Sequence, residues 1–304
     1  MARVPFQKPA LNVADQLAIL VARGLIVADS EEAEHYLANI GYYRLSGYTL
    51  PFQRGGDGGN RHDFWPGTTF EAILERYVFD RKLRLVVMDA VERIEVSIRA
   101  DLSNSIAVRH GPNWYQDPTL FNKNISHAKI IDDIKKQIGH DPQHNHRRHT
   151  FIRHYYNKYN APDMPPSWMV FEAISFGKIS FLFKALDQQQ CIYTCNKFGM
   201  RHKVLCSWFH GISYIRNLCA HHSRLWNRIC TIKPLVAKTY KSDLDPNTRV
   251  YAHLVVMQIL LDKIALDNHW ANRLSQLLDD HPNIPIKYMG FPEDWRDRAV
   301  WKLE

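Results

Sequence analysis

The 304-residue sequence has no apolar run approaching the ~20 residues that cross a bilayer. Its longest apolar stretch, Leu254 to Leu261, is interrupted by Gln258 and is typical of a buried helix. The first nine residues, MARVPFQKP, lack the apolar segment of a secretory signal. These absences argue against a helical membrane protein or a secreted one, so we expect a cytoplasmic location.

The sequence has few cysteines, and their spacing does not resemble that of a disulfide framework. An odd number of cysteines without framework-like spacing argues against a disulfide scaffold. Zinc sites favour close pairs of cysteines, and no second pair matches the one close pair in this sequence. We therefore expect reduced thiols, mostly in helices, and no metal site at the five cysteines: Cys191, Cys195, Cys206, Cys219 and Cys230.

Several catalytic motifs are also missing. The sequence contains no glycine-rich phosphate loop, no nucleophile elbow and no Cys/His protease pattern. What it does have is an excess of positive charge, with a net +8, a pI near 9.2 and 16 histidines. Such a balance is compatible with a polyanionic partner, chiefly nucleic acid, although the charge is not concentrated in one tract.

Apolar periodicity predicts an all-α fold. Capping boxes at Asp29 with Glu32 and at Thr68 with Glu71 mark two helix starts. The long pattern that follows Thr68 predicts a kink or a second helix before Gly111, because an unbroken run of that length is unusual. A small hairpin near residues 48–65 is the one expected exception, with residues 55–60 at its tip. Helices are predicted over 13–23, 29–41, 68–110, 168–184, 203–228 and 250–278.

Two segments organise the chain in this interpretation. Residues 1–67 form an N-terminal helical segment and residues 68–304 a larger helical domain, with one continuous domain as the alternative. A polar linker over 139–150 carries His140, His144, His146 and His149 at a spacing that fits no metal site. We interpret it as a mobile loop; contact with phosphates through Arg147, Arg148 and Arg153 is the alternative.

The most informative stretch is the predicted helix over 203–228, which separates into two stripes at about 100° per residue. One stripe is the core face: Leu205, Trp208, Ile212, Ile215 and Cys219. A solvated face would explain the other stripe, but solvated faces are usually rich in Lys and Glu, and this one has neither. Its members are His210, Tyr214, Asn217, His221, Arg224 and Arg228.

Within this stretch, RNLCAH over 216–221 matches the Arg-Asn-x-x-x-His pattern of the HEPN superfamily of helical RNA-cutting domains. The wider sequence resembles the Abi-like abortive phage-infection family, the AbiD/AbiF group. The resemblance runs from residue 8 to about 301 and leaves 140–149 unmatched. It is carried by IGYYRLSGY (40–48), FDRKLR (79–84), ERIEV (92–96), PPSWMVFEAISFG (165–177), RNLCAHHSRLWN (216–227) and MGFPEDW (289–295).

This resemblance implies a metal-independent endoribonuclease without a cofactor, acting as a toxin-like effector in antiphage defence. Arg216, Asn217 and His221 would be catalytic. Imidazole can take the proton of a ribose 2′-OH near neutral pH, and guanidinium can stabilise the charged phosphorane. The products would be a 2′,3′-cyclic phosphate and a 5′-OH. The candidates for supporting or RNA-binding roles are His210, Tyr214, His222, Arg224 and Arg228.

Arg216 and His221 are five positions apart, about 140° around a regular helix. They converge only if the helix starts or distorts there, or if a second copy faces the first. The resemblance implies the second case, a homodimer with a composite site. Alternatively, Arg216 forms an internal salt bridge with Glu92 or Glu95. His222 is as well explained by structure as by catalysis. The alternative function is a non-catalytic RNA-binding protein that holds a structured small RNA.

Overall fold

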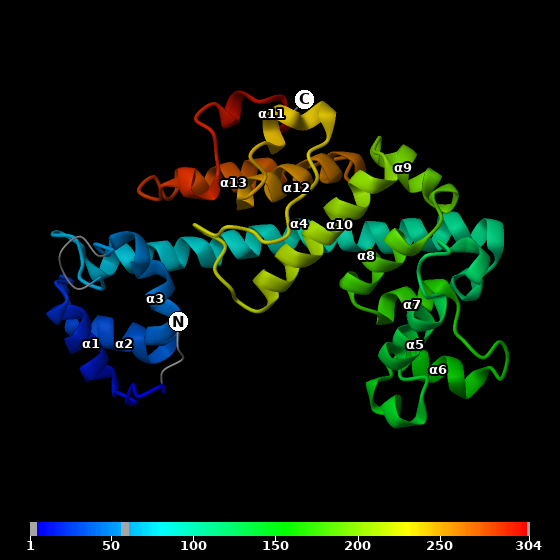
Figure 1. Ribbon diagram of the computed structural model, residues 1–304, viewed down its shortest axis with the longest axis horizontal. Helices are drawn as coiled ribbons and strands as arrows, with labels where there is room; N and C mark the ends of the chain where they lie inside the picture. The colour runs from blue at the N-terminus through cyan, green and yellow to red at the C-terminus, as the bar shows by residue number, and fades with distance from the viewer. Residues whose placement is uncertain (1–4, 56–60, 303–304) are drawn as a thin grey trace. The chain divides into compact units, whose positions relative to one another are not determined.

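The computed structural model describes residues 5–55 and 61–302 and is all-α (Figure 1). Within those ranges it has thirteen α-helices joined by short 3₁₀ turns, and no strand. The predicted fold class is therefore confirmed. The chain divides into two compact units, Met1–Lys82 and Leu83–Glu304, and the division falls inside helix α4. The sequence boundary at 67/68 stays a prediction.

The first unit contains α1 (Val13–Ala22), α2 (Ser30–Ile40) and α3 (Tyr42–Thr49), followed by the start of α4. The side chain of Asp29 accepts a hydrogen bond from the Glu32 N–H at 2.9 Å and caps α2 as predicted. The expected hairpin is reduced to a single antiparallel bridge between Gln53 and Phe64, and most of its tip, residues 56–60, lies outside the described residues.

Helix α4 spans Phe70–His110, 41 residues, as one continuous helix, so the predicted alternative of a second helix is wrong. No glycine or proline falls within it, and buried apolar residues recur at spacings of three and four from Phe79 to Ile106, so nothing breaks its register. Its cap is Thr69, whose hydroxyl accepts from the Ala72 N–H at 3.2 Å, rather than Thr68. Gly111, with φ +85°, ends the helix where predicted.

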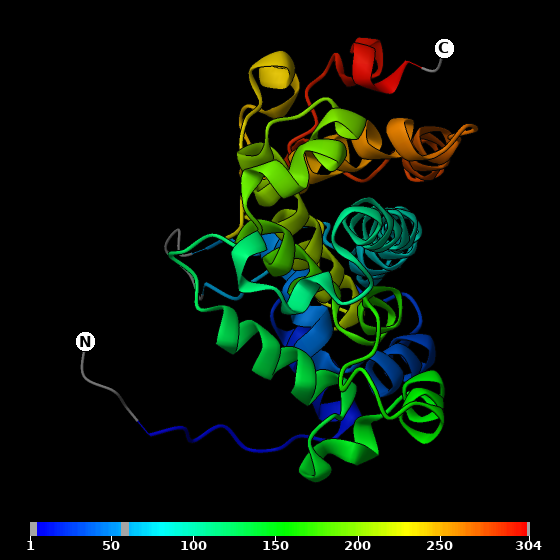
Figure 2. The same ribbon diagram turned by 90° about the vertical axis from the view of Figure 1, so that its right-hand side faces the viewer.

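The second unit builds on the rest of α4, from Leu83. Figures 1 and 2 show α12 and α13 along one side of this part of α4, with α10 crossing it and α8 beside α10. The indole N–H of Trp270 donates to the Val86 carbonyl at 2.8 Å and ties α13 to α4. The helices are α5 (His127–Ile138), α6 (Thr150–Lys158), α7 (Ser167–Ala173), α8 (Phe176–Ala185), α9 (Ile192–Phe198), α10 (His202–Ala220), α11 (Lys241–Leu244), α12 (Val250–Ile264) and α13 (Trp270–Asp279).

Two predicted helices are each split in the structure. The one over 168–184 breaks at Ile174, because the Arg99 guanidinium takes the carbonyls of Phe171 and Ile174 and ends α7. The one over 250–278 breaks after Ile264, where residues 265–269 leave the helix and Asn268 bonds back to Asp262 at 2.7 Å. In both cases, side-chain hydrogen bonds hold the chain at the point where it leaves the helix.

Candidate functional site

Helix α10 carries the motif, and its inner face holds it firmly in the second unit. Trp208, Ile212 and Ile215 are fully buried, as the predicted core stripe requires. The Trp208 indole N–H donates to the Leu235 carbonyl at 2.9 Å. Gly211 lies against α12, so closely that a Cβ there would come within 3.1 Å of the His253 ring. The outer face of α10 is therefore presented from a rigid support.

The helix ends inside the motif, at Ala220, and not at Arg228 as predicted. His222 adopts a left-handed conformation, φ +55°, which a helix cannot continue through. The result is a Schellman-type end in which the last carbonyls are satisfied by the turn itself. Its backbone bonds are His221 N–H to Asn217 O at 3.0 Å, His222 N–H to Cys219 O at 2.9 Å and Ser223 N–H to Leu218 O at 2.8 Å.

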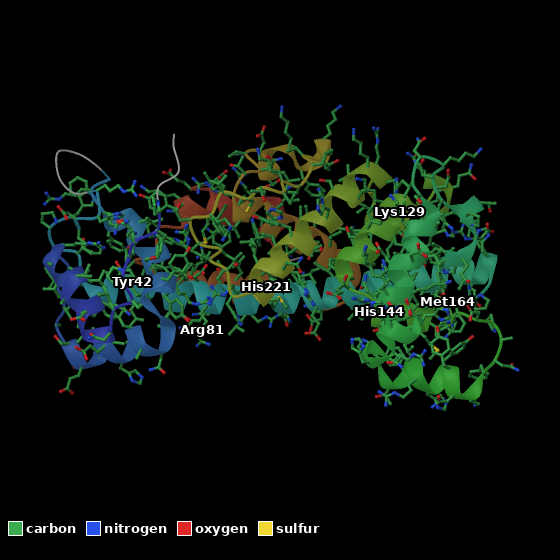
Figure 3. The ribbon with its side chains drawn as sticks, turned by 60° about the horizontal axis from the view of Figure 1, so that its bottom comes forward. Tyr42, Arg81, Lys129, His144, Met164 and His221 are labelled. Atoms are coloured by element: carbon green, nitrogen blue, oxygen red, sulfur yellow. The ribbon has the colours of Figure 1, made fainter. Side chains whose placement is uncertain are left out.

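The three motif residues differ in their exposure to solvent and in the face of α10 on which they lie. Asn217 and His221 are both exposed, one turn apart, and Figure 3 locates His221 at the end of α10. Arg216 is half-buried and turns to a neighbouring face. Among the described residues, the Arg216 side chain forms one hydrogen bond, from its Nη1 to the Asn217 Oδ1 at 3.4 Å. The imidazole and the guanidinium therefore face different parts of the surface of one chain.

Arg216 lines a hollow of about 620 Å³ between α10, α4 and α7 that His221 does not line. Four carboxylates share this hollow: Asp89, Glu92, Glu95 and Glu172. Glu95 is already paired with Arg99, and within the described chain Arg216 forms no ion pair. Glu92 and Glu95, which were expected as possible partners, thus lie near Arg216. Neither forms the salt bridge with Arg216 that was predicted as an alternative. Any phosphate approaching Arg216 would meet negative charge beside it.

The polar stripe proposed from the sequence is split by the structure. His210 lines a separate hollow of about 460 Å³ together with Lys184 of α8 and Lys203. Tyr214 turns inward, and its hydroxyl accepts from the Thr231 N–H at 3.4 Å. Both residues are helical as predicted, but the 100° periodicity does not tell which neighbouring elements will cover a helix face.

Arg224 and Arg228 follow the helix instead of extending it. Leu225 and Trp226, between them, are fully buried, which anchors this loop to the core. The Arg228 Nε donates to the Arg224 carbonyl at 2.5 Å, so the loop turns back on itself. The prediction that these arginines continue the stripe of α10 is wrong, because the helix has already ended at residue 220.

His253 is a residue that the sequence analysis did not single out. It lies on α12, is almost completely buried and donates from Nε2 to the Ile232 carbonyl at 3.0 Å. Burial lowers its pKa to about 4, because a charged imidazole would lose its hydration there. Its ring lies 6.2 Å from the Tyr214 ring, so it supports the motif helix from below. A lone histidine within the apolar stretch of residues 250–261 was the available signal.

The histidine-rich segment forms a 3₁₀ turn, Pro142–Arg147, that packs against α5, while the residues on either side of the turn contact α6. His140 bonds the Tyr156 hydroxyl at 2.9 Å, and Arg148 lies over the Tyr156 ring at 4.6 Å. Figure 3 places His144 in this region. The backbone path depends on Gly139, since a Cβ there would meet the His144 carbonyl at 2.5 Å. The side chain of Arg147 lies outside the described ones.

All five cysteines are free thiols, as predicted. Burial raises the pKa of Cys206 to about 11, which keeps this thiol protonated at neutral pH. In the described ranges, 5–55 and 61–302, no helix has the length and apolar character to cross a membrane. The same residues contain no group of three His, Cys, Asp or Glu side chains placed to hold a metal ion.

Comparison with known proteins identifies the family. The sequence model of the Abi-like protein family matches residues 35–227, more than half of the chain, and this range includes α10 and the complete motif. No curated protein matches the sequence, and no solved structure matches it. The chain therefore belongs to the Abi-like protein family.

Proposed function

We propose that this protein is an HEPN-type endoribonuclease of the AbiD/AbiF group that acts in abortive infection. Its membership in the Abi-like family suggests the biological role. The observation that carries the activity is the position of the Arg-Asn-x-x-x-His motif at the solvent-exposed end of an otherwise buried helix, with Asn217 and His221 open to a substrate. The net charge of +8 favours an RNA substrate.

The chemistry needs no group beyond these side chains. The His221 imidazole takes the proton of a ribose 2′-OH, and the 2′-oxygen attacks the adjacent phosphorus. The bond from phosphorus to the 5′-oxygen breaks, and the protonated imidazole gives its proton to that oxygen and returns to the neutral form. The products are a 2′,3′-cyclic phosphate and a 5′-OH. Arg216 stabilises the charge of the phosphorane through its guanidinium. The requirement for a 2′-OH selects RNA over DNA.

The geometry of one chain favours a composite site. Arg216 and His221 flank the end of α10 but line no common hollow in the described chain. A two-fold axis beside this helix end would bring Arg216 of one copy toward His221 of the other. The working enzyme would then be a homodimer, cytoplasmic in location, with RNA lying across the axis.

Mutation of the motif tests the activity. Arg216→Ala and His221→Ala should each lower RNA cleavage. The matched control is His154→Ala, at an exposed histidine of α6 in the same unit, which should cut RNA at the wild-type rate. Cleavage should persist in EDTA. Unchanged cleavage by both folded motif variants, or abolition by chelation alone, would contradict the proposal. RNA binding without any cleavage by the wild type would instead favour the non-catalytic binder.

Mixing the two inactive variants tests the composite site. A heterodimer of Arg216→Ala and His221→Ala would contain one intact pairing of arginine with histidine across the axis, so partial activity should return. Light scattering should report about twice the 35.6 kDa chain mass. If mixing restores nothing, or a strict monomer cuts RNA, then each chain supplies its own pair.

A further inference from the structure

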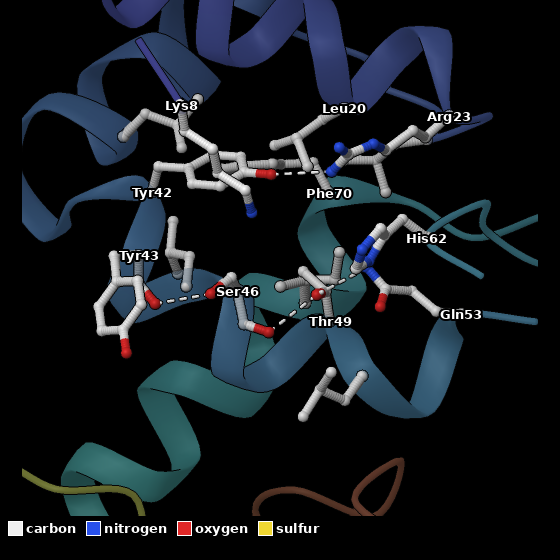
Figure 4. A pocket seen from close by; sticks show the side chains of 15 residues that line it. Lys8, Leu20, Arg23, Tyr42, Tyr43, Ser46, Thr49, Gln53, His62 and Phe70 are labelled. Atoms are coloured by element: carbon white, nitrogen blue, oxygen red, sulfur yellow. Dashed lines mark hydrogen bonds between the residues drawn. The ribbon is translucent and has the colours of Figure 1, made fainter. Parts of the chain in front are cut away.

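The first unit contains a hollow that the motif does not explain (Figure 4). It lies among α1, α3 and the start of α4, within Met1–Lys82, and its volume is about 240 Å³. A single water needs ~10–15 Å³ by the same measure, so a ligand of many non-hydrogen atoms has room there. Its floor is apolar and made of buried side chains, including Leu20, Leu45, Phe70 and Ile73.

Three potential cations enter this hollow from three separate segments: Lys8 before α1, Arg23 at its end and His62 before α4. Figure 4 shows their nitrogen atoms pointing into the same space. Among the described residues of this unit, no carboxylate lines the hollow. In the part of the chain that the structure describes, neither Lys8 nor Arg23 forms an ion pair, and Arg23 is half-buried.

Arg23 is held in place by its backbone and by one hydrogen bond. Its carbonyl accepts from the Phe64 N–H at 2.8 Å, and its Nη1 donates to the Tyr42 hydroxyl at 2.9 Å. A guanidinium has five N–H donors, so the remaining ones are available for a bidentate contact with an oxyanion.

The local field is positive. The pKa of His62 is lowered, first by burial and then by the charges of Arg23, Arg61 and Lys8, against a weaker opposite effect of Asp63. An anion bound among these groups would offset their mutual repulsion. The hollow is therefore a better place for negative charge than the acidic surroundings of Arg216.

The wall formed by Ser46, Thr49 and Gln53 can form hydrogen bonds with a sugar or a base. Ser46 and Thr49 donate their hydroxyl protons to carbonyls of their own helix, at 2.7 and 2.9 Å, which leaves their oxygens as acceptors. Gln53 uses one amide proton on Thr49 at 3.2 Å and keeps its carbonyl oxygen and second proton. Basic side chains, an apolar floor and amide and hydroxyl groups around one hollow suit a phosphate attached to a sugar and a base.

We propose that this hollow binds the phosphate monoester and first ring system of a nucleotide, either as a free mononucleotide or as the 5′-phosphorylated end of an RNA. Lys8, Arg23 and His62 hold the phosphate, and the apolar floor and the Ser46–Gln53 wall receive the nucleoside. The proposal does not rest on cleavage by the motif of α10, which lies in the other unit.

Isothermal titration of the full chain tests the site. The probes are the four ribonucleoside 5′-monophosphates, the unphosphorylated nucleosides and inorganic phosphate. At least one monophosphate should bind, and its nucleoside and inorganic phosphate should each bind about tenfold more weakly, because each offers only half of the contacts. No binding of any monophosphate, or equal binding of inorganic phosphate, overturns the proposal.

Matched variants locate the site. Arg23→Gln and Lys8→Gln should each raise the monophosphate Kd about tenfold, since each removes a charge-assisted contact. Lys8 lies on an exposed segment outside any helix, so its replacement leaves the fold intact. Arg81→Gln makes the same charge change on an exposed residue of the same unit that does not line the hollow, and it should leave Kd unchanged (Figure 3). Equal effects in all three variants would overturn the site.

A second arm distinguishes the two sources. Short RNAs with a 5′-phosphate and with a 5′-hydroxyl are compared on His221→Ala protein, which leaves the probe uncut under the proposed function. A 5′-phosphate preference that Arg23→Gln removes supports an RNA end as the ligand. Binding of the free monophosphate without that preference supports a mononucleotide. The absence of both overturns the proposal, whatever the outcome for cleavage.

Discussion

The end of α10 in the second unit and the hollow of the first unit differ in the charges that surround their basic side chains. The α10 end offers an exposed imidazole for proton transfer, but Arg216 beside it shares its hollow with three glutamates. The other region offers Lys8, Arg23 and His62, and no carboxylate of the described residues lines its hollow. Residue types alone therefore do not locate phosphate binding; the charges that surround each cation decide it.

The largest expected effect is on the cleavage rate, and comparing it with the mononucleotide Kd separates the two regions. His221→Ala should lower the cleavage rate by ~10²–10⁴, the usual cost of losing a positioned acid–base group, and leave the mononucleotide Kd unchanged. Arg23→Gln should raise that Kd about tenfold and leave the rate at saturating RNA unchanged. Single-turnover cleavage and titration calorimetry on both variants measure the four values. If either variant moves both readouts together, the two regions form one functional site.

The next effect concerns the stability of the unit that carries the motif. Because the pKa of His253 is about 4 in the folded protein and near 6.5 when exposed, the unfolded state binds the extra proton between these values. The unfolding free energy should therefore fall as the pH drops, by about 2 kcal/mol from pH 7 to pH 5.

Urea unfolding followed by tryptophan fluorescence checks this, since only Trp65 of the eight tryptophans lies in the first unit. The control is His253→Gln, which keeps a donor for the Ile232 carbonyl and should lose this part of the pH dependence. Identical pH profiles for the two proteins would mean that His253 does not titrate as its burial demands.

Sequence patterns located one of the two regions and not the other. The motif is local, so Arg216, Asn217 and His221 could be named as candidates from their match to the HEPN pattern, and their role stays a prediction. The all-α fold and the Asp29 cap followed from periodicity and capping rules. Lys8, Arg23 and His62 carry no such signal. They are far apart in the chain, and only the packing of the first unit brings them to one hollow.

Helix ends were the weakest part of the prediction, for a physical reason. Glycine marks the end of α2 at Gly41 and of α4 at Gly111, and both were found. The end of α10 rests on His222 in a conformation that usually requires glycine, and the end of α7 on a distant arginine. Neither a histidine in a helical pattern nor a tertiary hydrogen bond can be recognised from local sequence.

The left-handed conformation of His222 leads to a third prediction, a change of about 1 kcal/mol in the free energy of unfolding. His222→Gly should stabilise the protein by up to that amount, because glycine adopts this conformation without a steric cost. If the strain is retained for the imidazole, cleavage should fall several-fold in the same variant. The change should leave nucleotide binding in the first unit untouched.

Asn227→Gly is the matched comparison, since Asn227 also has positive φ, +53°, but asparagine tolerates it better, and its side chain accepts from Arg249 at 3.2 Å. It should bring no gain in stability. Chemical denaturation and cleavage assays measure both variants. A stabilised His222→Gly protein that cuts RNA at the wild-type rate would leave His222 a purely structural role.

The smallest effect tests the difference in local charge directly. Glu172 is exposed on α7 and lines the hollow of Arg216, so Glu172→Gln removes one negative charge from the surroundings of that guanidinium. Two unit charges ~6 Å apart in water interact by about 0.7 kcal/mol, so RNA affinity should rise about threefold at low salt. At 1 M salt, where the Debye length is ~3 Å, the gain should disappear.

Glu31→Gln on α2 makes the same charge change in the first unit, outside the cationic hollow, and should give no comparable gain. Filter binding on His221→Ala protein over a salt series measures all of these affinities without cleavage. If Glu172→Gln and Glu31→Gln raise affinity equally, RNA responds only to net charge, and the contrast between the two regions does not govern where the phosphates lie.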